Sequence, residues 1–278
     1  MANVTTTTAA SLIPEMWSMD VELAAQEHRG FSGRIKEFPF SGPGDVLHIP
    51  VIGKISAAAF SGTVTYTANT ESSVDITPDV SYAAVQIDRK ADVRAILALG
   101  PMYTAELGKG LAQYEDVQIA SLYAGLSQSM GGASNFSKAN HLLAIRYLIN
   151  SGKDKVVMGS SKIWGVIHPI QWDHVFGEAE VISANVRGDA GAGPAKLGTI
   201  DLAYGVTLDF SGNVQTAGSR AKNMYYTMDA FAIARKMTPT LDMDFHIDSL
   251  SNKIVASQDF GVAELNDGLG VVFETNDT

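Results

Sequence analysis

The chain has 278 residues, of which 46% are hydrophobic and 18% charged, and its formal net charge is -10. Cysteine is absent, which excludes disulfides, thiolate metal sites and cysteine nucleophiles. The acidic balance and the scattered basic residues argue against direct wrapping of nucleic acid, and no apolar run is long enough to span a membrane. Because so few charges are present to cover its surface, we expect copies of the chain or a partner to cover much of it.

The first part of the sequence predicts an arm. Residues 2–12 are rich in threonine and alanine and have no hydrophobic period, so we expect them to be extended, and nothing there resembles a signal peptide. A short amphipathic helix is predicted from Ile13 to about Glu27, with Trp17 on its apolar face. An exposed tryptophan near a terminus favours docking, either on the chain's own core or on a neighbour.

A long hairpin is predicted next. Two strand candidates, Asp45–Lys54 and Val74–Lys90, flank a nearly uncharged segment of small residues. Pro50 predicts that the first strand lies at a sheet edge or contains a bulge, and Pro78 interrupts the second strand. An isolated hairpin is at best marginally stable in water, so we expect a neighbouring subunit to support it. Phe60 and Tyr66 are its natural anchors.

The longest helix signal runs from Pro101 to Met130 and is followed by two glycines. Its apolar and polar residues lie on opposite sides of a helical wheel. Such a helix would be roughly 45 Å long and would act as a structural spine. Glu115 projects within the apolar stripe, which leaves two alternatives. Its side chain snorkels or pairs with a core arginine, or it is a charge directed at a partner subunit.

The remaining sequence predicts a mixture of helices and strands without a linker between independent domains. A helix is expected from Ser137 to Asn150, a buried strand at Ile163–Ile167 and a loop at Asn185–Gly198. Met224–Lys236 is expected to be a strand followed by a short helix. The last forty residues are strand-rich. The fold class is therefore predicted to be α+β.

A possible metal site lies in the segment Asp242–Asp248. Alternation along a strand places Asp242, Asp244, His246 and Asp248 on one face. The glycine and the twelfth-position acid of an EF-hand are missing, so we prefer a solvated strand face. A metal-binding protein or hydrolase that uses these four residues stays open as an alternative. No nucleotide-binding, zincin or serine-hydrolase motif is present, so we predict neither an enzyme activity nor a cofactor.

Several short segments occur in a characteristic order along nearly the whole chain. They are Ile13–Trp17, Gly44–Pro50, Ile87-Asp88, Val166–Pro169, Gly205–Leu208, Ser211–Val214, Met228–Ala232, Gly261–Leu265 and Gly268–Val272. This ordered set resembles the major capsid proteins of tailed bacteriophages with the HK97-like fold.

The resemblance implies how the chain is divided. Residues 1–38 would be an N-terminal arm and 39–79 an extended β-hairpin loop, and both would reach across neighbouring subunits. Residues 80–130 would give the peripheral domain its strand and spine helix, and 237–278 its returning strands. Residues 131–236 would form an axial domain around the five- and six-fold axes.

The resemblance also implies a function. The chain would be a structural protein that self-assembles as hexamers and pentamers into an icosahedral virion shell around packaged double-stranded DNA, assembled in the host cytoplasm. A separate scaffolding protein and a portal protein would be its partners, the DNA would lie close without specific contact, and no membrane would be involved. The assembly interface would include Trp17, Phe60, Tyr66 and Glu115. An encapsulin-like compartment that holds a cargo enzyme is the alternative within the same fold.

Overall fold

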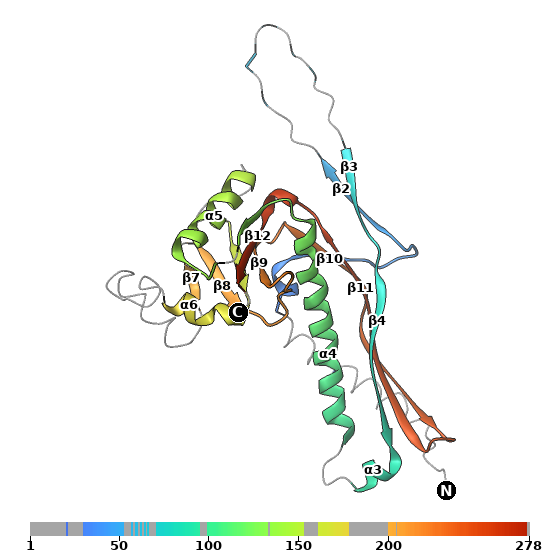
Figure 1. The fold of residues 1–278 in the computed structure, drawn as a ribbon. Coiled ribbons are helices and arrows are strands. Elements are labelled where there is room, and N and C mark those ends of the chain that lie inside the picture. The colour runs from blue at the N-terminus through green and yellow to red at the C-terminus, as the bar shows by residue number, and fades with distance from the viewer. Residues whose placement is uncertain are drawn as a thin grey trace.

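A computed structural model describes the larger part of the chain. The described residues are 21, 30–52, 57, 59, 60, 62, 64, 66, 71–94, 99–132, 134–152, 161–177, 200–203 and 205–276. Figure 1 shows a body of sheet and helices, from which a long arm of helix and strands extends in one direction and a hairpin in another. The predicted N-terminal helix, except for its buried Val21, and the predicted loop Asn185–Gly198 lie outside the described residues.

The long arm is a four-stranded sheet with one helix against it. Its strand order is β1-β10-β11-β4, in which β1 runs parallel to β10 and the other pairs are antiparallel. The elements are β1 (Lys36–Pro39), β4 (Asp79–Asp88), α3 (Arg89–Arg94), α4 (Leu99–Ser121), β10 (Phe231–His246) and β11 (Ser251–Glu264). The register between β10 and β11 shifts on both sides of Met237, close to Pro239, which cannot donate to a ladder.

The body is a six-stranded sheet in the order β5-β12-β9-β6-β8-β7. Its strands are β5 (Ser129–Gly131), β6 (Ile163–Ile167), β7 (Ile200–Ala203), β8 (Val206–Phe210), β9 (Arg220–Thr227) and β12 (Gly270–Asn276). Helices α5 (Lys138–Gly152) and α6 (Trp172–Gly177) accompany it, with short 3-10 turns at Ser32–Arg34, Leu122–Gly125, Pro169–Gln171 and Asp267–Leu269. The largest buried cluster lies here and includes Phe136, Tyr225 and Phe273.

The hairpin is a separate two-stranded sheet of β2 (Leu47–Ile52) and β3 (Glu71–Ile76). Among the described residues of the hairpin, Ile49 and Ile76 near its base are buried, and they pack against Ala232 and Ala234 of β10. Strands β2 and β3 extend away from the body in Figure 1. The predicted strand pair and its interruption at Pro78 are confirmed.

The spine helix is confirmed but shorter than predicted. α4 ends at Ser121, so its 23 residues span about 35 Å. The chain tightens into a 3-10 turn, and Leu126 is extended. Beyond this turn Ser127 donates its backbone N–H to Asp267, and residues 129–131 pair with β12 as strand β5. The helix therefore ends before the two glycines that the sequence offered, and the residues that follow bond to distant parts of the chain.

Two further expectations differ from the structure. The predicted helix at the end of Met224–Lys236 is wrong, because residues 231–246 form the continuous strand β10. Within the range predicted to return to the peripheral domain, β12 instead pairs with β9 and β5 in the six-stranded sheet. Helix α5 and strand β6 are confirmed. None of the described helices is long and apolar enough to cross a membrane.

Candidate assembly surface

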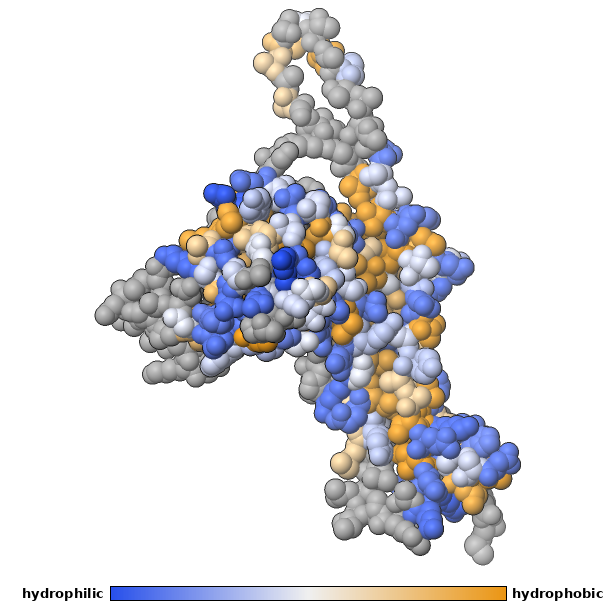
Figure 2. Space-filling view, in the orientation of Figure 1, coloured by the Kyte–Doolittle hydropathy of each residue, from blue (hydrophilic) through white to orange (hydrophobic). Residues whose placement is uncertain are grey.

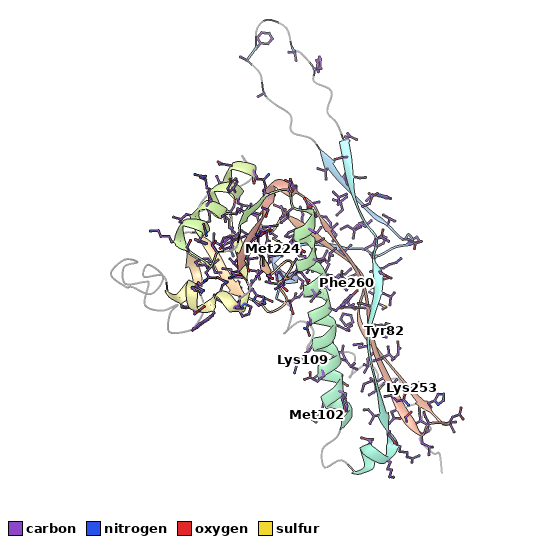
Figure 3. The ribbon with its side chains drawn as sticks, viewed as in Figure 1. Tyr82, Met102, Lys109, Met224, Lys253 and Phe260 are labelled. Atoms are coloured by element: carbon purple, nitrogen blue, oxygen red, sulfur yellow. The ribbon has the colours of Figure 1, made fainter. Side chains whose placement is uncertain are left out.

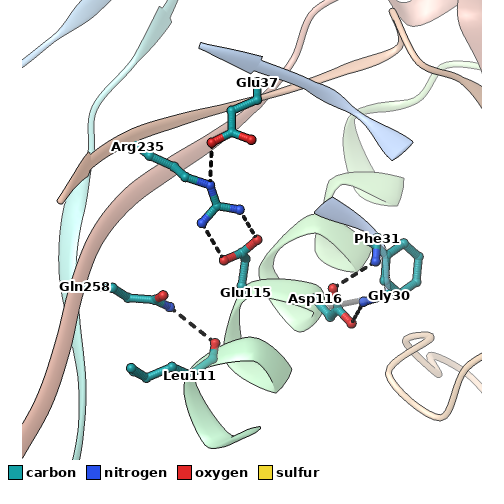
Figure 4. A network of polar contacts seen from close by, with 8 residues as sticks. All are labelled: Gly30, Phe31, Glu37, Leu111, Glu115, Asp116, Arg235 and Gln258. Atoms are coloured by element: carbon teal, nitrogen blue, oxygen red, sulfur yellow. Dashed lines mark hydrogen bonds and ion pairs between the residues drawn. The ribbon is translucent and has the colours of Figure 1, made fainter. Parts of the chain in front are cut away.

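A buried ion-pair network fixes the spine helix to the sheet. Glu115 is fully buried, and Arg235 of β10 donates to both of its carboxylate oxygens at 2.8 and 2.5 Å (Figure 4). Arg235 Nε lies 2.9 Å from Glu37 Oε1 on β1. Burial alone would lower the pKa of Arg235, but the hydrogen bonds and charges of Glu115 and Glu37 outweigh it and raise that pKa. The guanidinium therefore stays charged and joins three elements.

This pairing confirms the first of the two alternatives predicted for Glu115, in which its side chain pairs with a core arginine. Glu115 lies in helix α4, and its partner Arg235 lies in strand β10, 120 residues further along the chain. Because it is buried and paired within the chain, it offers no exposed charge to a neighbouring subunit. We therefore do not retain Glu115 as an interface residue.

The next residue of the helix anchors the segment that leads into β1. Asp116 accepts hydrogen bonds from the backbone N–H groups of Gly30 and Phe31 at 2.9 and 3.0 Å (Figure 4). Burial raises the pKa of Asp116, against the lowering effect of these two bonds. A side chain at Gly30 would lie 3.0 Å from Asp116 Oδ2, so this close approach favours glycine. Two adjacent carboxylates of α4 therefore hold the base of the predicted N-terminal arm.

Helix α4 also packs on the sheet through apolar contacts. Leu107 and Leu111 form a cluster with Leu241, Ile254 and Ala256, which also includes Val21. Gln258 donates its side-chain amide to the carbonyl of Leu111 at 3.2 Å (Figure 4). Together with the ion pairs, these contacts hold α4 against the four-stranded sheet.

The tip of the hairpin exposes the predicted aromatic anchors. Phe60 and Tyr66 are 76% and 91% exposed, and neither belongs to a buried cluster of the described residues. Trp17, the other predicted interface residue, lies outside the described residues. The roles of Trp17, Phe60 and Tyr66 at an interface stay predictions.

A second apolar surface, which the sequence reading missed, lies on β4. Its even-numbered residues are exposed, whereas Ala83 and Val85 pack toward α4. Val80 and Tyr82 are 59% and 73% exposed, and Figure 3 labels Tyr82 on this outer strand. Figure 2 shows hydrophobic colour along the length of the arm. Apolar residues occupy both faces of the strand from Val80 to Ile87, so the sequence does not show which face remains uncovered.

The alternative metal site is not formed. Among the residues that the structure describes, no group of three or more His, Cys, Asp or Glu side chains could hold a metal ion. Asp242 and Asp244 are exposed along β10, and Asp248 lies in the turn beyond its end. A straight strand spreads its ligands along its length, so the four side chains do not converge on one point.

The likeness of this chain to known proteins is found by comparing structures and not by comparing sequences. No protein-family model matches the chain. No curated protein matches it in sequence.

Solved structures match over most of the chain. A structure from Mycobacterium phage Che8 has a TM-score of 0.67 and 20% identity, covering 83% of this chain and 85% of that one. The capsid of Ralstonia phage GP4 has a TM-score of 0.67 and 12% identity, covering 88% and 87%. A virus-like particle from Pyrococcus furiosus has a TM-score of 0.58 and 9% identity, covering 93% and 98%. The chain therefore has the HK97-like fold of phage capsid proteins, as the ordered segments predicted.

Proposed function

We propose that this chain is a structural capsid subunit that self-assembles into an icosahedral shell. The observation that carries the proposal is the hairpin, whose aromatic tip extends beyond the chain's own core on a fold shared with phage capsids. Phe60 and Tyr66 at the tip, and Val80 and Tyr82 on β4, would be covered by neighbouring copies. No step of chemistry is required of such a protein.

The proposal also covers the building units, the location and the partners of the shell. We propose hexamers and pentamers as the building units, a virion capsid as the location and the host cytoplasm as the site of assembly. A separate scaffolding protein and a portal protein would take part. The net charge of -10 supports a shell in which packaged DNA lies close without binding strongly.

The two alternatives receive less support. The compartment alternative would predict the stronger likeness to a non-phage particle, yet the Pyrococcus furiosus particle has a lower TM-score than the phage GP4 capsid. The hydrolase alternative has lost its metal site, since its four ligands do not form a group.

The test is electron microscopy of the expressed protein. We expect negative-stain images to show shells, capsomers or tubes, with the protein alone or mixed with a scaffolding protein. A protein that stays monomeric under every assembly condition would contradict the proposal. Cryo-electron microscopy of any particles would then give the arrangement of subunits.

A further inference from the structure

A small cavity lies where α4, β4 and β11 meet. It has a volume of about 220 Å³. Tyr114 of α4 and Phe260 of β11 are among its walls, and their rings meet edge to face at 6.1 Å. Figure 3 labels Phe260 between the helix and the outer strands. A cavity of this size holds several water-sized groups, and the two rings give it an apolar wall.

Two polar residues of the cavity come from one face of β4. Asp79 and Ser81 are two residues apart in the strand, so their side chains lie on the same face, and both line the cavity. Two such positions are roughly 6.6 Å apart along a strand. A single atom between the two side chains can therefore lie within hydrogen-bond distance of both. Asp79 Oδ1 also accepts from the backbone N–H of Val80 at 2.9 Å, which holds the carboxylate beside the cavity.

Two buried oxygen atoms at this place have no hydrogen-bond partner among the described residues. One is Ser81 Oγ on the cavity wall. The other is Oε1 of Gln258, the residue that lies directly opposite Ser81 in the ladder of β4 and β11.

The orientation of the Gln258 amide shows what these atoms need. Its Nε2 donates to the carbonyl of Leu111 at 3.2 Å (Figure 4), so the buried Oε1 can only accept. A buried acceptor without a donor costs free energy. The inner end of the cavity is therefore short of hydrogen-bond donors.

The charge of the cavity decides which kind of donor fits it. Among the described residues that line it, Asp79 is the only charged one. Its carboxylate attracts a cation and repels an anion. A metal ion is less suitable, because no group of three or more His, Cys, Asp or Glu side chains in the described part of the chain could hold one. An organic ammonium group has three N–H donors and is also attracted by aromatic rings.

We propose that this cavity binds a small primary alkylammonium ion. Two of its N–H groups donate to the Asp79 carboxylate and to Ser81 Oγ, and the third is available to the adjacent Gln258 Oε1. The alkyl chain packs against Phe260 and Val262, which also line the cavity. The site goes beyond the structural function proposed above and does not depend on the formation of a shell.

Calorimetric titration of the purified full chain with butylammonium chloride tests the site. The titration is made at constant ionic strength, and 1-butanol and butyrate are the control ligands, since they have four carbons but no positive charge. We expect saturable binding of one butylammonium ion per chain, at least tenfold tighter than the binding of either control. The absence of saturable binding, or equal binding of 1-butanol, would overturn the inference.

A charge variant separates the site from the overall negative charge of the chain. Asp79→Asn should weaken butylammonium binding at least tenfold, and Asp88→Asn is its matched control. Asp88 is exposed at the other end of β4, and its carboxylate likewise accepts from a backbone N–H, that of Lys90 at 2.9 Å. Equal weakening by the two variants would show that the ion is held by net charge alone and would overturn the site.

A second variant removes the buried hydroxyl. Ser81→Ala deletes an oxygen that has no partner among the described residues, so the urea midpoint of the ligand-free protein should not fall. Butylammonium binding should nevertheless weaken several-fold, and unchanged binding would overturn the role of Ser81. A chain that binds butylammonium but forms no particles would contradict the proposed function and leave this site intact.

Discussion

The six-stranded sheet and the β2–β3 hairpin cover their aromatic side chains differently. In the sheet, Tyr225 and Phe273 are fully buried and pack edge to face against each other. Between the strands of the hairpin, Phe60 and Tyr66 are mostly exposed. The comparison shows that an apolar side chain in the sequence favours burial but does not show whether the same chain provides it.

Strand β10 contains both situations along its length. Leu241 is buried beneath α4, Met243 and Phe245 on the same face are partly exposed, and Ile247 just beyond the strand is mostly exposed. Helix α4 packs mainly over β11 and β4, and among the described residues Arg89 of α3 lies over the ring of Phe245 at 6.0 Å. The exposure of apolar residues along β10 therefore follows the position of α4 among the described elements.

The largest effect is expected where the sheet buries an aromatic ring. Phe273→Ala removes a fully buried ring that also packs edge to face on Phe136, and should lower the free energy of unfolding by about 3–5 kcal/mol. Phe60→Ala is the matched control, expected to change stability by less than about 0.5 kcal/mol. Urea denaturation of the dissociated subunits measures both. If both variants lost the same unfolding free energy, the proposed difference between the sheet and the hairpin would be contradicted.

The second-largest loss of stability is expected at the ion pair between Glu115 and Arg235 in the long arm. Arg235→Met removes the guanidinium that pairs with the buried Glu115 and should cost about 3 kcal/mol of unfolding free energy at neutral pH.

Urea denaturation checks this, with Arg235→Met/Glu115→Leu as the control. The double variant should recover much of the loss, since neither member of the buried Glu115–Arg235 pair then remains. A double variant as unstable as the single one would show that packing, rather than charge, holds the helix here.

A smaller effect is expected at Asp116. Its folded-state pKa is raised by burial, so its stability contribution is fully present below the pKa of the unfolded chain and is lost as the pH rises through the folded pKa. Asp116→Asn should remove this part of the pH dependence. Unfolding of both proteins across the acidic range measures the difference, and parallel pH profiles would contradict the assignment.

The smallest effect is expected in the hairpin. Asp75 lies opposite His48 and contacts it at 2.6 Å, and this hydrogen bond lowers the pKa of Asp75. Its contribution is therefore present above the pKa of the unfolded chain and is lost as the pH falls through the folded pKa. Because the pair is exposed, Asp75→Asn should leave global unfolding unchanged and only speed hydrogen exchange of the β2 and β3 amides. A change in global stability would show that the hairpin folds as one unit with the body.

Local signals in the sequence predicted much of the candidate site. The interruption at Pro78, the spine helix and the uncharged tip with Phe60 and Tyr66 all follow from short-range patterns. The exposed β4 surface was missed, because apolar residues occupy both faces of the strand from Val80 to Ile87, the pattern of a strand covered on both faces of its sheet. Only the absence of a second partner strand among the described residues shows that β4 lies at the edge of its sheet.

The sequence by itself determined most of the element types and the ordered segments that resemble a capsid protein. These depend on periodicity and turn chemistry within a few residues. The tertiary structure decided where α4 ends, that β12 joins the body, and that Glu115 meets Arg235 rather than a neighbour. Those outcomes depend on contacts between residues far apart in the chain, and no local pattern encodes which distant side chain fills a given space.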